Sequence, residues 1–578
     1  MVAPVGAAGL SIGSGLREAL RGGYRAGDLR ADLMAGLTAG IVALPLAMAL
    51  AIASGVPPQH GIYTSIVAGA VIALLGGSRY NVSGPTAAFV VILAPISAQF
   101  GLGGLLVATL MAGVILMCMG FMRLGQLIQF IPHPVTTGFT AGIGVVIATL
   151  QVKDLLGLDV ERMPEHYLER VGALARALPG AHWQDAALGA LTLAVLLLWP
   201  RVSRRVPSPL IALAAGAVAS AVLSRVLDGF RVETIASRFG GIPRQPPLPV
   251  LPWNLPGPDG QPIGLDLADL RQLFTAAFAI AILGAIESLL CAVVADGMAG
   301  SKHNPDGELI AQGVGNVLAP FFGGIAATGA IARTATSIRS GARSPLAALV
   351  HALLVLAAVL ALAPLLGYLP MASLAALLLL VAWNMCELPN FLQILRVAPR
   401  SDVIVLLTCF TLTVVFDMVV SVSVGVVLAA LLFMRDMAEL SKARLVDQHP
   451  ELPQRKLPEG VLIYEVAGPM FFGAAEKAVE TLRTVAGKAD AFILHFSRVP
   501  AMDITGLVAL ESALRVLHRE GAFVILAGVQ AQPRMLLARA GIKPQDGQLA
   551  ICRSLEEALA LIEVRAAARR AAAAPGGA

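Results

Sequence analysis

Fourteen apolar segments, two of them short, follow one another between residues 33 and 434, joined mostly by short polar connections. Continuous apolar runs of this length predict membrane-spanning helices, whereas the strands of a membrane β-barrel alternate in polarity. The longer connections, about 152–184 and 227–271, contain proline-rich stretches and predict irregular loops. The predicted segments lie near 33–54, 61–78, 84–98, 103–122, 135–151, 185–200, 208–226, 272–297, 307–325, 330–340, 345–366, 369–386, 402–416 and 418–434.

The pattern changes after Met434, where short apolar runs alternate with helical patterns. Alternation of this kind predicts a small α/β domain. The predicted strands are 459–466, 490–496 and 522–528, and the predicted helices are 473–486, 505–519, 531–540 and 555–570. We therefore divide the chain into an N-terminal segment (1–30), a membrane domain (31–436), an α/β domain (437–565) and a low-complexity tail (566–578) that we expect to be disordered.

Composition agrees with a polytopic membrane protein, because 57% of the residues are hydrophobic, only 14% are charged and the mean hydropathy is +0.78. The start of the chain lacks the pattern of a cleavable signal peptide. Basic residues gather in the short loops after even-numbered segments, such as Arg79, Arg123 and Arg435. Because basic loops face the cytoplasm, we expect both termini and the α/β domain there, and the chain in a bacterial inner membrane.

Five scattered cysteines give neither a disulfide framework nor a metal site. The sequence contains no nucleotide-binding loop, metal cluster or catalytic triad, so we expect neither an enzyme nor a cofactor. Nothing in it indicates a nucleic-acid partner. The lipid bilayer and a small solute are the partners that the composition itself supports.

Two glycine-broken stretches, 82–89 and 327–334, occupy matching places in the two halves of the membrane domain. Each follows a Gly-Gly pair, Gly76-Gly77 or Gly323-Gly324, at a similar distance. Together with a third glycine in register, this spacing predicts an internal repeat. Seven segments per repeat require the second copy to be inverted, and paired broken helices in inverted repeats indicate a transporter's central site.

The broken helices predict an anion site. A helix that begins within the membrane leaves its first N–H groups unpaired and carries partial positive charge at that end. Two such ends facing one another would attract an anion, and Arg333 would add a permanent cation with several N–H donors. Two other interpretations of Arg333 remain open: an acid neutralises it, or its side chain reaches the membrane surface.

Glu287 is a second ionisable residue within a predicted spanning segment. Acids at this depth are costly and usually face a cavity or a partner. Reversible protonation of Glu287 would couple anion entry to protons, because the neutral acid does not repel the substrate. A structural salt bridge is the alternative.

Several motifs resemble the signature of the SulP anion permeases. They include Pro45-Leu46-Ala47-Met48-Ala49-Leu50-Ala51, Gly55-Val56-Pro57-Pro58, Gly76-Gly77-Ser78-Arg79 and Pro132-His133-Pro134-Val135. The end of the chain resembles a STAS domain, which is the usual tail of these proteins. Stretches such as Gly284–Val294 and Leu412–Met418 are most similar to a branch of the family formed by dicarboxylic acid uptake proteins of enteric bacteria.

The resemblance implies a membrane fold of seven plus seven segments, with core and gate domains and an elevator-type motion. Segments 1–4 and 8–11 would form the moving core, and segments 5–7 and 12–14 would form the gate. Carried over by position, the substrate site would comprise Leu46, Leu50, Thr86, Ala87, Ala88, Gly329, Ala330, Ile331, Ala332 and Arg333. Glu287 takes the place of the coupling acid. Cys291 stands where a sodium-coupled relative has a hydroxyl, which favours protons over sodium.

The same resemblance implies proton-coupled uptake of C4 dicarboxylates (succinate, fumarate, aspartate) as the function. It also implies a homodimer, with acyl carrier protein as a partner of the STAS domain. A sulfate or bicarbonate transporter of the same family is the first alternative. A membrane-anchored STAS signalling or binding module is the alternative from another class.

Thr505 falls on the STAS position that is phosphorylated in anti-sigma-factor antagonists, within Met502-Asp503-Ile504-Thr505-Gly506. We therefore consider it a possible regulatory residue. Asp503 and Thr505 are also ordinary residues at the start of a helix, so capping is the competing interpretation.

Overall fold

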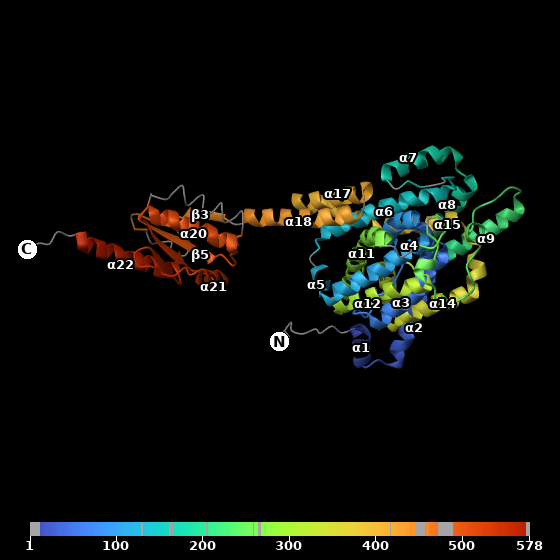
Figure 1. Cartoon of the computed structure of the whole chain (residues 1–578), viewed down its shortest axis with the longest axis horizontal. Helices are drawn as coiled ribbons and strands as arrows, with labels where there is room; N and C mark the ends of the chain where they lie inside the picture. The colour runs from blue at the N-terminus through green and yellow to red at the C-terminus, as the bar shows by residue number, and fades with distance from the viewer. Residues whose placement is uncertain are drawn as a thin grey trace, which may run out of the picture. The chain divides into compact units, whose positions relative to one another are not determined.

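The computed structural model describes residues 12–573 apart from 129–130, 161–162, 165, 204–205, 258, 264–266, 417, 441, 447–456, 459 and 472–488. The chain divides into two compact units, Met1–Val426 and Val427–Ala578 (Figure 1). The first unit is helical apart from two very short strands, and the second is built on a five-stranded sheet.

Every predicted apolar segment coincides with a helix. These helices are α2 (Ala26–Ala53), α3 (Pro58–Leu75), α4 (Ala87–Phe121), α6 (His133–Leu156), α8 (Trp183–Val202), α9 (Ser208–Val226), α11 (Leu267–Ala299), α12 (Pro305–Leu318), α13 (Ile331–Arg339), α14 (Leu346–Leu366), α15 (Met371–Met385), α17 (Arg400–Val415) and α18 (Met418–Leu440). Within the described ranges, ten helices are long and apolar enough to cross a membrane unaided. The short helices α12 and α13 lie on either side of the broken stretch in the second half of the membrane domain. The predicted fold class is therefore confirmed.

Helix α4 contains two predicted segments because it folds back at Gly101, whose φ of +67° is a left-handed conformation that suits glycine. A Cβ added at Gly284 of α11 would lie 3.4 Å from Phe89 Cζ and 3.6 Å from Leu116 Cδ1. A straight helix would separate Phe89 and Leu116 by about 40 Å. The two parts of α4 therefore run side by side in opposite directions.

Shorter helices occupy several connections: α1 (Ser14–Arg21), α5 (Gly125–Ile128), α7 (Tyr167–Ala177), α10 (Ile235–Phe239) and α16 (Leu388–Val397), with 3-10 turns η1 (Leu178–Gly180), η2 (Pro252–Asn254) and η3 (Ala319–Phe322). The expectation of irregular loops was therefore incomplete for both long connections. In α10 the side chains of Thr234 and Ser237 form a reciprocal capping box, which allows a five-residue helix to form among prolines.

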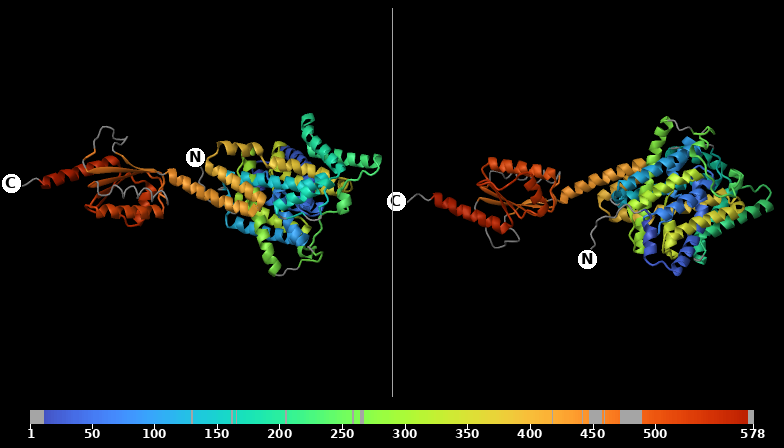
Figure 2. Two further views of the ribbon diagram at one scale, coloured as in Figure 1. Left: turned by 90° about the horizontal axis from the view of Figure 1, so that it is seen from above. Right: turned by 60° about the horizontal axis from the view of Figure 1, so that its bottom comes forward.

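The membrane helices pack in two groups that combine both halves of the chain. Helix α12 packs against α4, and α14 packs against α2 and α3, which places these helices in the predicted core. Helices α15 and α17 pack against α6, and α8 packs against α9, as predicted for the gate. In Figure 2 the blue helices of the first half interleave with the green and yellow helices of the second.

The second unit contains a sheet of order β3-β4-β5-β6-β7, with β3 antiparallel and the other strands parallel. Its strands are β3 (Lys442–Val446), β4 (Val461–Ala467), β5 (Ala491–Arg498), β6 (Phe523–Ala527) and β7 (Leu549–Cys552), and its helices are α20 (Ile504–Arg519), α21 (Ala531–Arg539) and α22 (Leu555–Ala573). Alternate residues of β5 enter different cores, Phe492 and Leu494 on the face of α20 and Ile493 on the face of α22.

The sequence predicts three of these five strands and misses β3 and β7. The predicted helix 473–486 lies outside the described residues. The expectation of disorder from residue 566 is wrong as far as Ala573, because α22 continues that far. The alanines in this part of the chain have the highest intrinsic helix propensity, which favours continuation of the helix.

Candidate functional site

The two broken stretches meet as a pair of two-residue strands, β1 (Ser83–Gly84) and β2 (Thr328–Gly329). They are antiparallel, with Ser83 opposite Gly329 and Gly84 opposite Thr328. Residues that correspond in the overlaid halves therefore exchange partners, as an approximate two-fold axis requires. This register supports the inverted repeat and places its centre between the two strands.

Glycine is required at this crossing because other chain segments approach it closely. A Cβ on Gly84 would lie 2.6 Å from Arg333 Nη1, and one on Gly329 would lie 2.7 Å from Asn81 Oδ1. Neither space holds a methyl group without displacing a buried polar side chain. The glycines seen in the sequence thus allow the two halves to cross at short range.

Helices α4 and α13 begin beside this crossing. Their N-cap residues, Thr86 and Ala330, have extended backbones, and neither side chain accepts a hydrogen bond from its own helix. Helix dipoles place partial positive charge at both starts. The unsatisfied N–H groups of two helices are therefore concentrated around one position inside the membrane domain.

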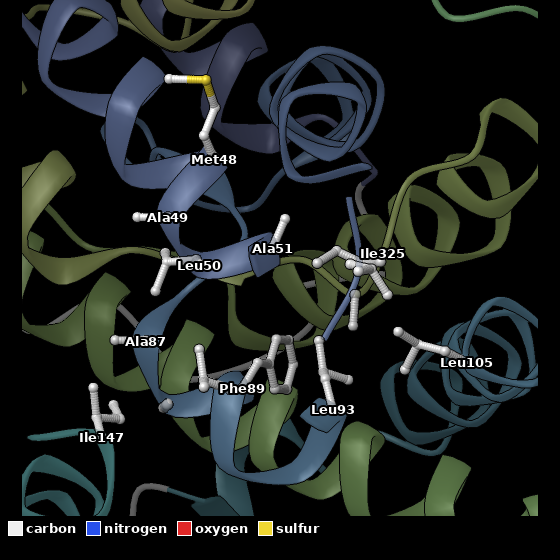
Figure 3. Close-up of a cluster of buried hydrophobic side chains, with 14 of the residues drawn as sticks. Met48, Ala49, Leu50, Ala51, Ala87, Phe89, Leu93, Leu105, Ile147 and Ile325 are labelled. Carbon is white, nitrogen blue, oxygen red and sulfur yellow. The ribbon is translucent and has the colours of Figure 1, made fainter. Parts of the chain in front are cut away.

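The predicted substrate residues surround these helix starts on three helices. Thr86, Ala87, Ala88 and Ala330 are buried, Gly329 lies in β2, Ile331 is half-buried and Ala332 is exposed. On α2, Leu50 is buried and Leu46 is half-buried, and both belong to or pack against the main apolar core. Figure 3 shows Leu50 and Ala87 within the same cluster of side chains. The site is therefore apolar around its two polar helix starts.

Glu287 reaches the first helix start from α11. Thr86 Oγ1 donates a hydrogen bond of 2.8 Å to Glu287 Oε2, and Glu287 is only partly buried. One turn earlier, the carbonyl of Gly284 accepts a bond of 3.1 Å from Thr328 Oγ1 of the second stretch. Helix α11 consequently contacts both stretches and brings the carboxylate of Glu287 to the centre.

Arg333 lies behind the first stretch. Its side chain is 2% exposed, and Nη2 donates to the carbonyl of Pro85. Within the described residues it forms no ion pair, and Nε and Nη1 have no hydrogen-bond partner. This geometry matches neither the salt-bridge interpretation nor the surface-reaching one. The guanidinium holds the two stretches together and adds a positive charge beside the helix starts.

Cys291 lies one turn after Glu287 on α11. Its thiol donates to Asn81 Oδ1 at 3.0 Å and to Thr334 Oγ1 at 3.2 Å. Thr334 Oγ1 also accepts a bond from the Val82 backbone. The thiol thus supports the crossing, and a soft sulfur is a poor ligand for sodium. In the described part of the chain no group of three His, Cys, Asp or Glu residues could hold a metal ion.

Sequence reasoning missed Glu308, which is fully buried in the first turn of α12. Its Oε2 accepts bonds from the backbone N–H groups of Gly77 and Ser78, and its Oε1 accepts bonds from Asn81 Nδ2 and Gln312 Nε2. Gln312 Nε2 also donates to Ser83 Oγ, so this network supports β1 directly. The available signal was the run of Asn304, Glu308, Gln312 and Asn316 at four-residue spacing within an apolar segment.

Thr505 lies in the second unit and is exposed near the start of α20. The capping residue is Asp503, whose Oδ1 accepts a 2.8 Å bond from the Gly506 backbone N–H. Capping therefore does not use the Thr505 hydroxyl.

Comparison with known proteins gives two matches to family models: the sulfate permease family over residues 29–409 and the STAS domain over residues 453–558. The putative sulfate transporter YvdB of Bacillus subtilis (strain 168) is 40% identical over 86% of this chain and 91% of its own length. The bicarbonate transporter BicA of Picosynechococcus sp. is 29% identical over 84% of this chain and 86% of its own length.

Solved structures agree on the fold. The structure of the murine Slc26a9 anion transporter in the inward-facing state covers 97% of this chain and 96% of its own, with a TM-score of 0.82 and 19% identity. The transmembrane domain of a cyanobacterial bicarbonate transporter BicA covers 70% of this chain and 98% of its own, with a TM-score of 0.59 and 27% identity. Fold, internal repeat and family models agree, and this chain belongs to the sulfate permease family and has a C-terminal STAS domain.

Proposed function

We propose that this protein is a secondary active transporter of small oxyanions, with sulfate as the first candidate substrate and bicarbonate as the second. The observation that carries the proposal is the crossing of β1 and β2, which brings two helix starts and the buried cation Arg333 together within the membrane. Such a site favours negative charge and uses mainly backbone N–H donors. It contains none of the groupings that would support catalysis among the described residues, and we propose no enzymatic activity.

The single buried cation among the site's described residues favours an oxyanion over a C4 dicarboxylate. A dicarboxylate has two negative ends separated by a carbon chain and is best held by two separate groups of donors or cations. At this site Arg333 is the one buried arginine or lysine among the described residues of β1, β2, α4, α11 and α13. The relatives compared above are also named for sulfate and bicarbonate, so the alternative expectation is better supported than dicarboxylate uptake.

Glu287 is our candidate for proton coupling. Its carboxylate lies beside the N-cap of α4, where an anion and an ionised acid would repel one another. Protonation of Glu287 would remove this repulsion and allow the proton and the anion to enter together. Cys291 does not offer the hard oxygen ligand that sodium would need.

The remaining expectations complete the proposal. The helix groups that we term core (α2–α4, α11–α14) and gate (α6, α8, α9, α15, α17 and α18) would move relative to one another in an elevator-type cycle. We place the protein in a bacterial inner membrane as a homodimer, with both termini and the STAS domain in the cytoplasm. The exposed Thr505 hydroxyl is available for modification, and an acyl carrier protein remains a possible STAS partner.

Uptake measured in one preparation of proteoliposomes tests the proposal. The purified protein is reconstituted once, and labelled sulfate, bicarbonate and succinate are supplied separately with and without an inward proton gradient. We expect sulfate uptake that the gradient increases. Succinate uptake without sulfate uptake would overturn the oxyanion assignment, and no uptake of any of the three would overturn the transporter proposal for this substrate class.

A further inference from the structure

Two cavities with contrasting linings adjoin one another at the end of α9, away from the crossing strands. One has a volume of about 770 Å³ and is lined largely by polar and charged residues of α6, α8, α9 and α10. The other has a volume of about 630 Å³ and is lined almost entirely by apolar residues of α2, α9 and α14. Ala217, Ala221 and Tyr368 line both, so the two cavities share a wall and lie side by side.

The cavities follow one another along α9. The apolar cleft extends from Leu210 to Ala221, and the polar cavity from Ala217 to Arg225 at the helix end. The cleft also contacts the middle of α2 at Gly40 and the second half of α14 from Leu354 onwards. An amphipathic molecule lying along α9 would therefore have its apolar part at membrane depth and its polar part at the membrane surface.

The walls of the cleft are open to the surroundings. Val218 and Leu365 are each 63% exposed, whereas Leu213 and Leu369 at its base are buried. In a membrane-spanning unit, exposed apolar walls of this kind face hydrocarbon chains. The cleft is therefore accessible to an acyl chain directly from the bilayer.

The charges of the polar cavity are balanced. Four basic side chains line it (Lys153, Arg225, Arg231 and Arg238), and so do four acidic ones (Asp154, Asp159, Asp185 and Glu233), which gives zero net formal charge with His182 neutral. Arg238 pairs with Asp154 at 2.8 Å and with Glu233 at 3.5 Å. Arg225 and Arg231 form no ion pair within the described residues, so their donors are available to a phosphate.

We propose that the two adjoining cavities bind one zwitterionic glycerophospholipid of the phosphatidylethanolamine type, with its phosphate and ammonium groups in the polar cavity and an acyl chain in the apolar cleft. Balanced charges suit a headgroup that carries both signs better than an anionic headgroup. The bound chain lies between core helices α2 and α14 and gate helix α9. A lipid in this position would have to shift or leave when core and gate move against one another, a consequence that rests on the proposed function.

Lipid retention tests the site independently of transport. The full-length protein is purified from vesicles containing equal amounts of phosphatidylethanolamine and phosphatidylglycerol, and retained lipid is measured by native mass spectrometry. Ala221→Trp fills the junction of the cavities, and Val222→Trp adds the same side chain at an exposed neighbouring position that lines neither cavity. We expect wild type and Val222→Trp to retain phosphatidylethanolamine. The amount retained by Ala221→Trp should be at least about 10-fold lower, because the indole displaces buried CH₂ groups of the lipid.

The headgroup assignment has its own pair of variants. Arg225→Gln removes an unpaired cation from the polar cavity, whereas Arg201→Gln removes an exposed arginine at the opposite end of the gate helices. We expect retention to fall only in Arg225→Gln. Equal retention in Ala221→Trp and wild type would overturn the site, and preferential retention of phosphatidylglycerol would overturn the headgroup. If the wild type takes up no sulfate, these binding results still stand, and the absence of uptake counts against the proposed function alone.

Discussion

Glu287 and Glu308 are both glutamates within membrane helices of the core, yet their surroundings differ. Glu308 is fully buried and accepts hydrogen bonds from four donors on α12 and on the segment before β1. Glu287 is partly exposed, and within the described residues the one bond that it accepts comes from Thr86. A carboxylate whose acceptor sites are filled by fixed donors joins the segments that supply those donors and stabilises the structure. A carboxylate with free acceptor sites beside a helix start can exchange protons, so depth in the membrane does not by itself mark a functional acid.

The largest effect is expected for Glu308→Ala. The change leaves two backbone N–H groups and two side-chain amides buried without their acceptor. We expect a loss of stability of about 3–5 kcal/mol, because a buried charge network is broken on one side. Thermal unfolding of the detergent-solubilised protein measures it. An unchanged midpoint would show that the four bonds do not stabilise the core.

Glu287→Gln should change transport but leave stability nearly unaltered. Glutamine still accepts the bond from Thr86 but cannot ionise, so we expect stability within about 1 kcal/mol of wild type. Sulfate uptake by proteoliposomes should lose its dependence on pH and on the proton gradient. Uptake that keeps the wild-type pH profile would remove Glu287 from the coupling role.

Arg333→Gln tests whether the buried charge contributes to anion binding. We expect the dissociation constant for sulfate to rise about 10-fold, which corresponds to about 1.4 kcal/mol. Arg339→Gln is the matched control, because Arg339 is exposed in the last turn of the same helix. Isothermal titration of both variants measures the difference. Equal affinities would assign Arg333 to structure alone.

Tyr24→Phe should have the smallest effect. Asp32 is another buried carboxylate, and it accepts bonds from Tyr24, from the backbones of Arg343 and Ser344, and from the Ser344 hydroxyl. Burial and the bond to Asp32 raise the pKa of Tyr24 to about 12, so its hydroxyl remains a donor at neutral pH. Removing one of four donors should cost about 1 kcal/mol. A loss as large as that of Glu308→Ala would mean that the number of remaining donors does not govern stability.

The same contrast explains what the sequence could reveal. Apolar length predicts the spanning segments, and the glycines at 84 and 329 predict the two broken stretches, because both signals are local. The role of Glu308 depends on donors from residues 77–81, more than two hundred positions earlier, and no local pattern shows that contact. The division into core and gate came from resemblance to a family, since apolar length is the same in both groups. Strands β3 and β7 were missed because both lie at edges of the sheet, and β7 is only four residues long.

The exchange of partners between β1 and β2 also has a kinetic consequence. Perfect two-fold symmetry at the crossing would make the routes to the two sides of the membrane chemically identical. The helix starts are not identical, because Thr86 offers a hydroxyl to Glu287 and Ala330 offers only a methyl group. An ion that leaves towards one compartment can therefore lose these contacts in a different order from an ion that leaves towards the other. Import and export by this protein should accordingly have different rate-limiting steps, and the cycle should rectify flux.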